Sequence, residues 1–280
     1  MSQNLNPQQH AALKYIDGPL LVLAGAGSGK TSVITQKIAY LVEECGIPAR
    51  NIAAVTFTNK AAREMKARVS TLLGKSEGKG LKVSTFHNLG LTIIRTESKA
   101  LGFKPGFSIL DQEDCKNLLK ELLVRNTDLD EKLIDTAQNT ISNWKNGLLE
   151  PRQTANASNS TGEQAIAMLY ERYQRALKAY NAVDFDDLIM IPVLLFRSQP
   201  EVLAKWQRRI RYLLVDEYQD TNLAQYELVK TLVNEKQALT VVGDNDQSIY
   251  AWRGARPENL MQLQEDFPAL NIIKLEQNYR

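Results

Sequence analysis

Six short apolar runs, rich in β-branched residues, most strongly constrain what this chain can fold into. They lie at residues 20–26, 52–57, 81–86, 211–217, 238–244 and 271–277. Most lack the alternation of polar and apolar residues that marks a half-exposed strand, so we expect strands buried on both faces of a parallel sheet. Helical patterns separate several of the runs, and this order predicts an α/β domain of the doubly wound type.

Two of the connecting segments have the apolar spacing of helices that face a core. The segment that begins at Thr31 places on one face Val33, Ile34, Ile38, Leu41 and Val42. The segment that begins at Lys60 does the same with Ala61, Met65, Val69 and Leu72. Both are therefore expected to pack against the sheet.

The middle of the chain follows a different pattern. Between residues 88 and 196 the strand signals disappear and amphipathic helices replace them. One helix carries, at helical spacing, Ile166, Tyr170, Tyr173, Leu177 and Tyr180. The polar segment 150–163 is expected to form a loop in this region. The predicted organisation is an α/β domain in two parts, residues 1–87 and 197–280, interrupted by an α-helical insert at residues 88–196.

The composition is ordinary for a soluble globular protein, with 44% apolar and 24% charged residues. A net charge of +2 is too small to indicate a nucleic-acid partner by itself. Cys45 and Cys115 lie far apart without the spacing of a metal site, which predicts free thiols in a reducing compartment. The N-terminus has no signal-peptide pattern and no apolar run approaches about 20 residues, so we expect a cytoplasmic protein without a membrane segment.

The sequence LLVLAGAGSGKTSVITQKI combines a buried strand, a glycine-rich turn and the start of a helix. In this setting the backbone N–H groups of the turn bind phosphate, and the positive end of the helix dipole adds to the field. Lys30 would reach the β- and γ-phosphates of a nucleotide, and the Thr31 hydroxyl would hold Mg²⁺. The alternative is a glycine-rich turn followed by a surface lysine. The residues of the turn are Ala24, Gly25, Ala26, Gly27, Ser28 and Gly29, with Ala24 where the strict motif has glycine.

Two adjacent carboxylates, Asp216 and Glu217, follow the fourth apolar run. Parallel sheets bind ligands at the carboxyl ends of their strands, so this pair can face the glycine-rich turn despite the distance in sequence. Asp216 suits Mg²⁺, directly or through water, and Glu217 suits the orientation and deprotonation of an attacking water. The alternative is a solvated pair of acids at a strand end.

With these motifs in place, the chain resembles the UvrD/Rep/PcrA helicases of superfamily one. The resemblance covers essentially the whole chain and rests on seven motifs that occur in the family's order. They are AGAGSGKT, TFTNKAAREM, STFHNLG, DFDDL, VDEYQDT, GDNDQSIYAWRGARPEN and LEQNYR. The resemblance implies a RecA-like P-loop NTPase domain that uses ATP and Mg²⁺.

The resemblance assigns further residues to the nucleotide. Gln9 would read the adenine edge, and a polar residue on an exposed helix is the alternative. Gln247 would sense the γ-phosphate, Arg280 would contact it, and Tyr279 would lie under the adenine. The family's arginine after the GKT threonine is replaced here by Ser32, so a cation–π contribution of about 1 kcal/mol to the adenine stack is missing.

The family's motifs also supply residues expected to face single-stranded DNA. Aromatic rings stack on bases at about 1–3 kcal/mol each, while hydroxyls, amides and cations hold phosphates. The candidates are Phe57, Thr58, Asn59, Lys60, Thr85, Phe86, His87, Tyr250, Trp252 and Arg253. Core packing is the alternative for Phe57 and Phe86, and turn capping is the alternative for His87.

The acidic motif DFDDL, residues 184–188, invites comparison with a metal site. We expect instead that Asp184 caps a helix and that Asp186 and Asp187 lie in its first turn, where acidic side chains are favourable.

The resemblance implies that a second RecA-like domain follows Arg280 and is absent from these 280 residues. It implies a DNA translocase or helicase that moves 3′→5′, with single-stranded DNA, single-strand/double-strand junctions and replication or repair proteins as partners. Residues 1–280 alone are expected to bind nucleotide weakly, to hydrolyse it slowly and not to unwind DNA. A P-loop ATPase of another pathway, a non-catalytic DNA-binding module and the motor of a helicase–nuclease are the alternatives.

Overall fold

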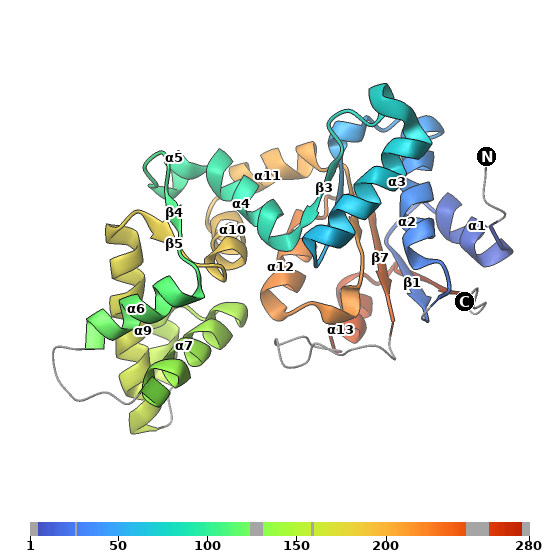
Figure 1. Cartoon of the computed structure of the whole chain (residues 1–280). Coiled ribbons are helices and arrows are strands. Elements are labelled where there is room, and N and C mark those ends of the chain that lie inside the picture. Colours follow the sequence, from blue (N-terminus) through green and yellow to red (C-terminus); the bar gives the residue numbers. More distant parts are fainter. Residues whose placement is uncertain (1–4, 26, 124–130, 158–159, 245–257, 276–280) are drawn as a thin grey trace. The chain divides into compact units, whose positions relative to one another are not determined.

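The computed structural model describes residues 5–25, 27–123, 131–157, 160–244 and 258–275 (Figure 1). The chain divides into two compact units. Unit 1 comprises residues 1–89 and 196–280, and unit 2 comprises residues 90–195. The insert suggested by the sequence, residues 88–196, differs from unit 2 by two residues at its start and one at its end.

Unit 1 contains a parallel sheet of six described strands, which confirms the predicted α/β class. The strand order is β3-β2-β6-β7-β1-β8, and every neighbouring pair runs parallel. Each strand lies inside the apolar run that predicted it. The bounds are β1 Leu20–Ala24, β2 Ile52–Thr56, β3 Lys82–Thr85, β6 Tyr212–Val215, β7 Leu239–Gly243 and β8 Asn271–Leu275.

Helices connect these strands. Those of unit 1 are α1 Pro7–Lys14, α2 Lys30–Glu43, α3 Asn59–Glu77, α11 Pro200–Arg209, α12 Leu223–Leu232 and α13 Glu258–Asp266, with 3₁₀ turns at Ala49–Asn51 and Tyr218–Asp220. Helices α4 Phe86–Thr96 and α10 Asp187–Ser198 cross the boundaries between the units. Capping boxes define two of the starts, because Asn6 with Gln9 begins α1 and Asn222 with Gln225 begins α12.

One face of the sheet packs against α1, α2 and α3, and Figure 1 shows α2 and α3 running beside the strands. Leu20, Val22 and their counterparts on neighbouring strands join this core. The intervening residues, such as Leu21, are buried as well, which is the pattern of a sheet covered on both faces. The prediction for α3 was wrong at one position: Leu73 is buried, whereas Leu72 is exposed.

Lys37 is fully buried inside this core. Its ammonium donates to the carbonyls of Ala12 and Tyr15, the groups left without intrahelical partners at the end of α1. It also lies 5.9 Å from the centroid of the Tyr212 ring. Burial lowers the pKa of Lys37 to about 7, and the nearby Cys45 thiol opposes the change only in part. Lys37 therefore links α2 to the end of α1. Above neutral pH its amine is largely uncharged, so the free-energy cost of burying a charge is small.

We expect Lys37 to make folding stability rise with pH relative to a Lys37→Met variant. An unfolded lysine keeps its proton up to its ordinary pKa, whereas the folded one loses it near pH 7. Between pH 7 and 10 the unfolded chain thus binds more protons, and stability gains up to ~1.4 kcal/mol per pH unit. Urea unfolding of both proteins across this range measures the difference. Lys14→Met, at an exposed lysine of α1, should run parallel to the wild type; parallel curves for Lys37→Met would contradict the prediction.

Unit 2 is mainly helical, as predicted, with three departures from the predictions. Its elements are α5 Ser98–Leu101, β4 Ser108–Ile109, α6 Gln112–Leu123, α7 Glu131–Asn146, α8 Pro151–Ala157, α9 Thr161–Ala179 and β5 Ala182–Val183, together with most of α4 and α10. One departure is Tyr180, which was expected on the buried face of a helix but follows the end of α9 and is exposed. The short strands β4 and β5 pair in parallel and were not predicted, because two residues are too few to show a pattern.

The third departure is α8, which lies in the segment expected to be a loop. Pro151 occupies its first position, where the missing N–H costs nothing. The Gln153 side chain accepts the N–H of Glu150, and the Thr154 hydroxyl donates to the Pro151 carbonyl. Thr154 is buried, and α8 packs against α9. Local capping and tertiary packing thus outweigh the polar composition.

A fully buried lysine, Lys145 of α7, organises the core of unit 2. Its ammonium lies 2.6 Å from Asp184 Oδ2 and 2.8 Å from Asp187 Oδ1. Tyr173 donates to Asp184 at 2.9 Å, and Gln174 donates to Asp187 at 3.2 Å. Burial alone would lower the pKa of Lys145, but the two carboxylates raise it overall. Burial, and then Asp184, raises the pKa of Asp187 to about 6.

The prediction for DFDDL is confirmed in part. Asp184 accepts the N–H of Asp187 at 2.9 Å and so caps α10, and Asp187 lies in the first turn. Asp186 precedes the helix, and its carboxylate accepts a hydrogen bond from Asn146. The sequence did not reveal the partner of Asp184 and Asp187, since Lys145 lies 39 residues from the first and 42 from the second.

Replacement of Lys145 by methionine should lower the free energy of unfolding by about 3–5 kcal/mol, because two buried carboxylates would lose their counterion. Urea denaturation followed by circular dichroism measures the loss. Lys116→Met is the matched control: Lys116 lies 2.7 Å from Asp135 at the surface, and such pairs contribute about 0–1 kcal/mol. Equal losses in the two variants would show that the Lys145 cluster does not support the fold.

Candidate active site

The candidate residues gather at one edge of the sheet because its strands are parallel. The glycine-rich turn follows β1, Asp216 and Glu217 follow β6, and Asp244 follows β7. In the sheet, β7 lies between β1 and β6, so the ends of these three strands are neighbours. This edge is where open α/β sheets bind ligands.

The glycine-rich turn leads from β1 into α2. Gly27 and Gly29 have positive φ angles of 80° and 82°, which glycine adopts without strain. The Ser28 hydroxyl donates to the Gly25 carbonyl at 2.7 Å and tightens the turn. Gly29 precedes α2 without a side-chain cap, so the first N–H groups of the helix, from Lys30 onward, have no side-chain acceptor at this cap. An anion such as phosphate would satisfy them.

Gln9 lies against this turn. It is only 4% exposed, which excludes the alternative of a polar residue on an exposed helix surface. Its amide nitrogen donates to the Ser28 carbonyl at 3.0 Å, and its amide oxygen accepts the Asn6 N–H at 3.0 Å. A Cβ atom at Gly29 would lie 2.7 Å from the Gln9 amide nitrogen. Gln9 therefore supports the turn in this structure, and its contact with adenine stays a prediction.

Lys30 is the centre of the site. Its ammonium lies 3.7 Å from Glu217 Oε2 and 3.6 Å from Asp244 Oδ2. Both distances exceed those of hydrogen bonds, and within the described part of the chain the buried ammonium makes none. The structure thus brings together the lysine of the first turn and the acidic pair nearly 190 residues later, as the sequence analysis required.

Asp216 and Glu217 differ in environment. Asp216 is 5% exposed, and burial followed by the charge of Glu217 raises its pKa to about 6. Glu217 is half-exposed, and its backbone has a φ of 51°, a left-handed conformation that costs a non-glycine residue about 1–3 kcal/mol. Such strain often occurs at functional positions. The backbone N–H of Glu217 donates to Asp216 Oδ1 at 3.0 Å, which joins the two residues.

Two residues of this site, Asp244 and Gln219, were not predicted from the sequence. Asp244 is 3% exposed and lies beside Lys30, and Gln219 is 2% exposed and joins Glu217 to the backbone of Asp244. The signal for Asp244 was present, since it also follows an apolar run. Gln219 had no signal of its own, because its role depends on a strand that comes later in the chain.

The oxygen ligands suit Mg²⁺, which binds proteins through one or two carboxylates together with substrate phosphates and water. The Asp216 carboxylate and the Thr31 hydroxyl, in the first turn of α2, would supply such oxygens. The raised pKa of Asp216 indicates negative charge that its surroundings compensate poorly, and a cation would compensate it. Among the described residues no group of three or more His, Cys, Asp or Glu side chains could hold a metal ion without a substrate.

The candidate DNA-facing residues after β2 and β3 have structural roles of their own. Phe86 is 1% exposed, and its ring centroid lies 5.3 Å from that of the half-buried Phe57, so the packing alternative describes Phe86 here. Thr58 accepts the Ala61 N–H at the start of α3, and Thr85 accepts the Asn88 N–H at the start of α4.

The remaining candidates of this group, Asn59, Lys60 and His87, differ in exposure and in their contacts. Asn59 accepts a hydrogen bond from the Asn88 side chain at 3.2 Å, which ties the starts of α3 and α4 together. Lys60 is exposed, 4.0 Å from Glu64. His87 is half-buried, and burial lowers its pKa, so the ring is neutral at pH 7. DNA contacts of all these residues stay predictions.

Several predicted site residues lie outside the described residues: Ala26, Gln247, Tyr250, Trp252, Arg253, Tyr279 and Arg280. Ser32, which stands in place of an arginine, accepts a hydrogen bond from the Gln36 side chain at 3.1 Å. The two cysteines are free thiols, as predicted.

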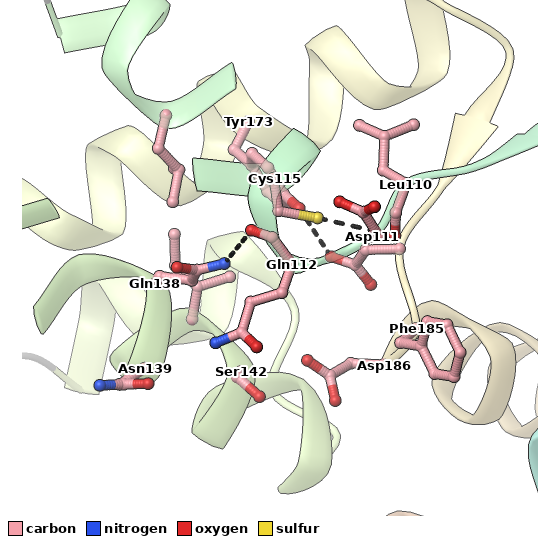
Figure 2. Close-up of a pocket in the computed structure, with 13 residues that line it drawn as sticks. Leu110, Asp111, Gln112, Cys115, Gln138, Asn139, Ser142, Tyr173, Phe185 and Asp186 are labelled. Carbon is pink, nitrogen blue, oxygen red and sulfur yellow. Dashed lines mark hydrogen bonds between the residues drawn. The ribbon is translucent and has the colours of Figure 1, made fainter. Parts of the chain in front are cut away.

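A separate cavity of about 420 Å³ lies within unit 2 (Figure 2). Asp111 and Gln112 of the α6 start, Gln138 and Ser142 of α7, and Asp186 line it. A hydrogen bond of 2.8 Å from the Gln138 side chain to the Gln112 carbonyl crosses its wall. None of the predicted nucleotide or DNA residues lines this cavity.

In the described part of the chain, no helix has the length and apolar character needed to cross a membrane.

Comparison with known proteins agrees with this geometry. Residues 5–268 match the UvrD/REP helicase N-terminal domain. The chain is 58% identical over 276 residues to ATP-dependent DNA helicase Rep of Salmonella typhimurium and, to the same extent, of Escherichia coli. It is 46% identical over 280 residues to ATP-dependent DNA helicase PcrA of Staphylococcus epidermidis. These alignments cover 99% of this chain but only 41%, 41% and 38% of the relatives. The chain therefore belongs to the UvrD/REP helicase family and corresponds to its N-terminal domain.

Proposed function

We propose that this chain is the ATP-binding part of a DNA-dependent ATPase that drives a single-stranded-DNA translocase and helicase. The observation that carries the proposal is the buried ammonium of Lys30, which makes no hydrogen bond within the described residues. Lys30 is the first residue of α2 and directly follows the glycine-rich turn. A buried cation without hydrogen bonds is costly, and the β- and γ-phosphates of ATP would satisfy it. The similarity to ATP-dependent DNA helicases supports ATP and DNA as ligands.

The residues of the site divide the reaction between them. The backbone of the turn and Lys30 bind the phosphates, and Thr31 and Asp216 would hold Mg²⁺. When bound, Mg²⁺ neutralises charge on the phosphate oxygens. Glu217, the half-exposed carboxylate, orients a water and accepts its proton. A carboxylate 3.7 Å from Lys30 is close to the position of the γ-phosphate that Lys30 would contact.

The proposed DNA track begins at the carboxyl ends of β2 and β3, where Phe57, Asn59 and Lys60 lie near the start of α3. Its partners would be single-stranded DNA and junctions with duplex DNA, with movement 3′→5′. A second RecA-like domain beyond Arg280 would complete the ATP site, and replication or repair proteins would recruit the enzyme. Free thiols fit a reducing compartment such as the cytoplasm.

Two substitutions separate binding from turnover. Lys30→Ala should abolish measurable binding of a fluorescent ATP analogue, because the main cation of the site is lost. Glu217→Gln should keep nucleotide binding but lower the hydrolysis rate by about 10²–10⁴-fold, since general-base catalysis contributes that much. Lys14→Ala, at an exposed lysine of α1, is the control. Wild-type turnover in both site variants would contradict the proposed function.

Single-stranded DNA should stimulate ATP hydrolysis, most strongly in a chain that extends past Arg280. The proposed second domain would supply an arginine to the γ-phosphate, and such residues contribute about 10³–10⁵-fold in related reactions. The experiment measures phosphate release by residues 1–280 and by the extended chain, each with and without DNA. If DNA does not change the hydrolysis rate of either protein, the result would instead support a P-loop ATPase of another pathway. DNA binding without any ATP hydrolysis would support a non-catalytic DNA-binding module.

A further inference from the structure

The buried side chain of Gln219 forms hydrogen bonds to two acidic residues of the candidate site. It lies in the 3₁₀ turn Tyr218–Asp220 that follows Glu217, and its side chain is buried. Its amide nitrogen donates to Glu217 Oε2 at 2.6 Å. Its amide oxygen accepts the backbone N–H of Asp244 at 2.9 Å. One side chain thus connects the two acidic residues on either side of Lys30.

The two partners dictate the residue type. A carboxylate only accepts hydrogen bonds and a backbone N–H only donates, so the bridging group needs a donor at one end and an acceptor at the other. A side-chain amide provides both. A glutamate at this position would place like charges together at Glu217, and an apolar residue would leave the buried N–H of Asp244 without this acceptor.

The bridge also affects the chemistry that Glu217 can perform. Gln219 and Lys30 both approach Oε2, whereas Oε1 accepts no hydrogen bond within the described residues. The carboxylate is therefore held at one oxygen while the other stays available for water. Glu217 is half-exposed and lies between β6 and the 3₁₀ turn Tyr218–Asp220, outside any helix or strand, so few other contacts restrain its orientation.

We propose that Gln219 is a positioning residue that fixes the Glu217 carboxylate relative to Lys30 and the end of β7. This inference rests on the proposed function, in which Glu217 activates the attacking water. Within the described residues, the hydrogen bonds of the Gln219 side chain go to Glu217, Asp220 and Asp244, so we expect its effect to fall on turnover and not on nucleotide binding. A misplacement of about 1 Å at a reacting group can cost on the order of 10²-fold in rate.

The test uses single-turnover ATP hydrolysis with enzyme in excess, which resolves slow rates, together with direct binding of a fluorescent ATP analogue. Gln219→Leu should lower the hydrolysis rate by about 10–100-fold while the nucleotide Kd stays unchanged. Gln219→Glu keeps an acceptor for the Asp244 N–H but sets a carboxylate against Glu217, and it should lose at least as much. In the Gln219→Leu, Glu217→Gln double variant the rate should be no lower than in Glu217→Gln alone, since Gln219 acts through Glu217.

Gln225→Leu is the matched control, because Gln225 is another buried amide nearby in the chain, and its hydrogen bonds within the described residues belong to the capping box of α12. It should lower the melting temperature as much as Gln219→Leu does and leave the hydrolysis rate unchanged. Wild-type turnover in Gln219→Leu, a loss matched by weaker nucleotide binding, or additive losses in the double variant would each overturn the role of Gln219. If Lys30→Ala and Glu217→Gln also retained wild-type turnover, the proposed function itself would fail.

Discussion

The structure depends on a parallel arrangement of strands that brings three chain segments to one buried ammonium. Lys30 lies at the end of the turn after β1, and the acidic groups beside it follow β6 and β7. Only parallel strands present all their carboxyl ends at one edge, so the topology itself creates the site. A reversal of β6 would move its acidic pair to the opposite edge of the sheet.

Three lysines among the described residues show how differently a fold can accommodate a cation: Lys145 and Lys37 are fully buried, whereas only the ammonium of Lys30 is buried. Lys145 is hydrogen-bonded to two carboxylates, and its charge is part of the core of unit 2. Lys37 is held by two carbonyls, and burial lowers its pKa to about 7. Lys30 has carboxylates nearby but no hydrogen bond within the described residues. The first two are satisfied by the protein, whereas the third is arranged so that a ligand can satisfy it.

Buried side chains also support the glycine-rich turn and the helix beside it. Gln9 holds the Ser28 carbonyl, and Lys37 holds the opposite end of the same helix, α1, against α2. On the other side, Gln219 joins the Glu217 carboxylate to the end of β7. Gln9 thus supports the turn directly through Ser28, while Lys37 holds the helix that carries Gln9.

The sequence by itself determined the six strands, the helices that face the core and the motif that places Lys30 at a helix start. These features depend on local apolar spacing and on glycine, which act over a few neighbouring residues. Tertiary structure alone decided which of Leu72 and Leu73 is buried, that residues 151–157 form a helix, and which acids surround Lys30 and Lys145. It also decided that Phe86 packs inside and that Gln219 bridges to Asp244. These outcomes depend on contacts between residues far apart in the chain, and no local pattern encodes the partner across such a distance.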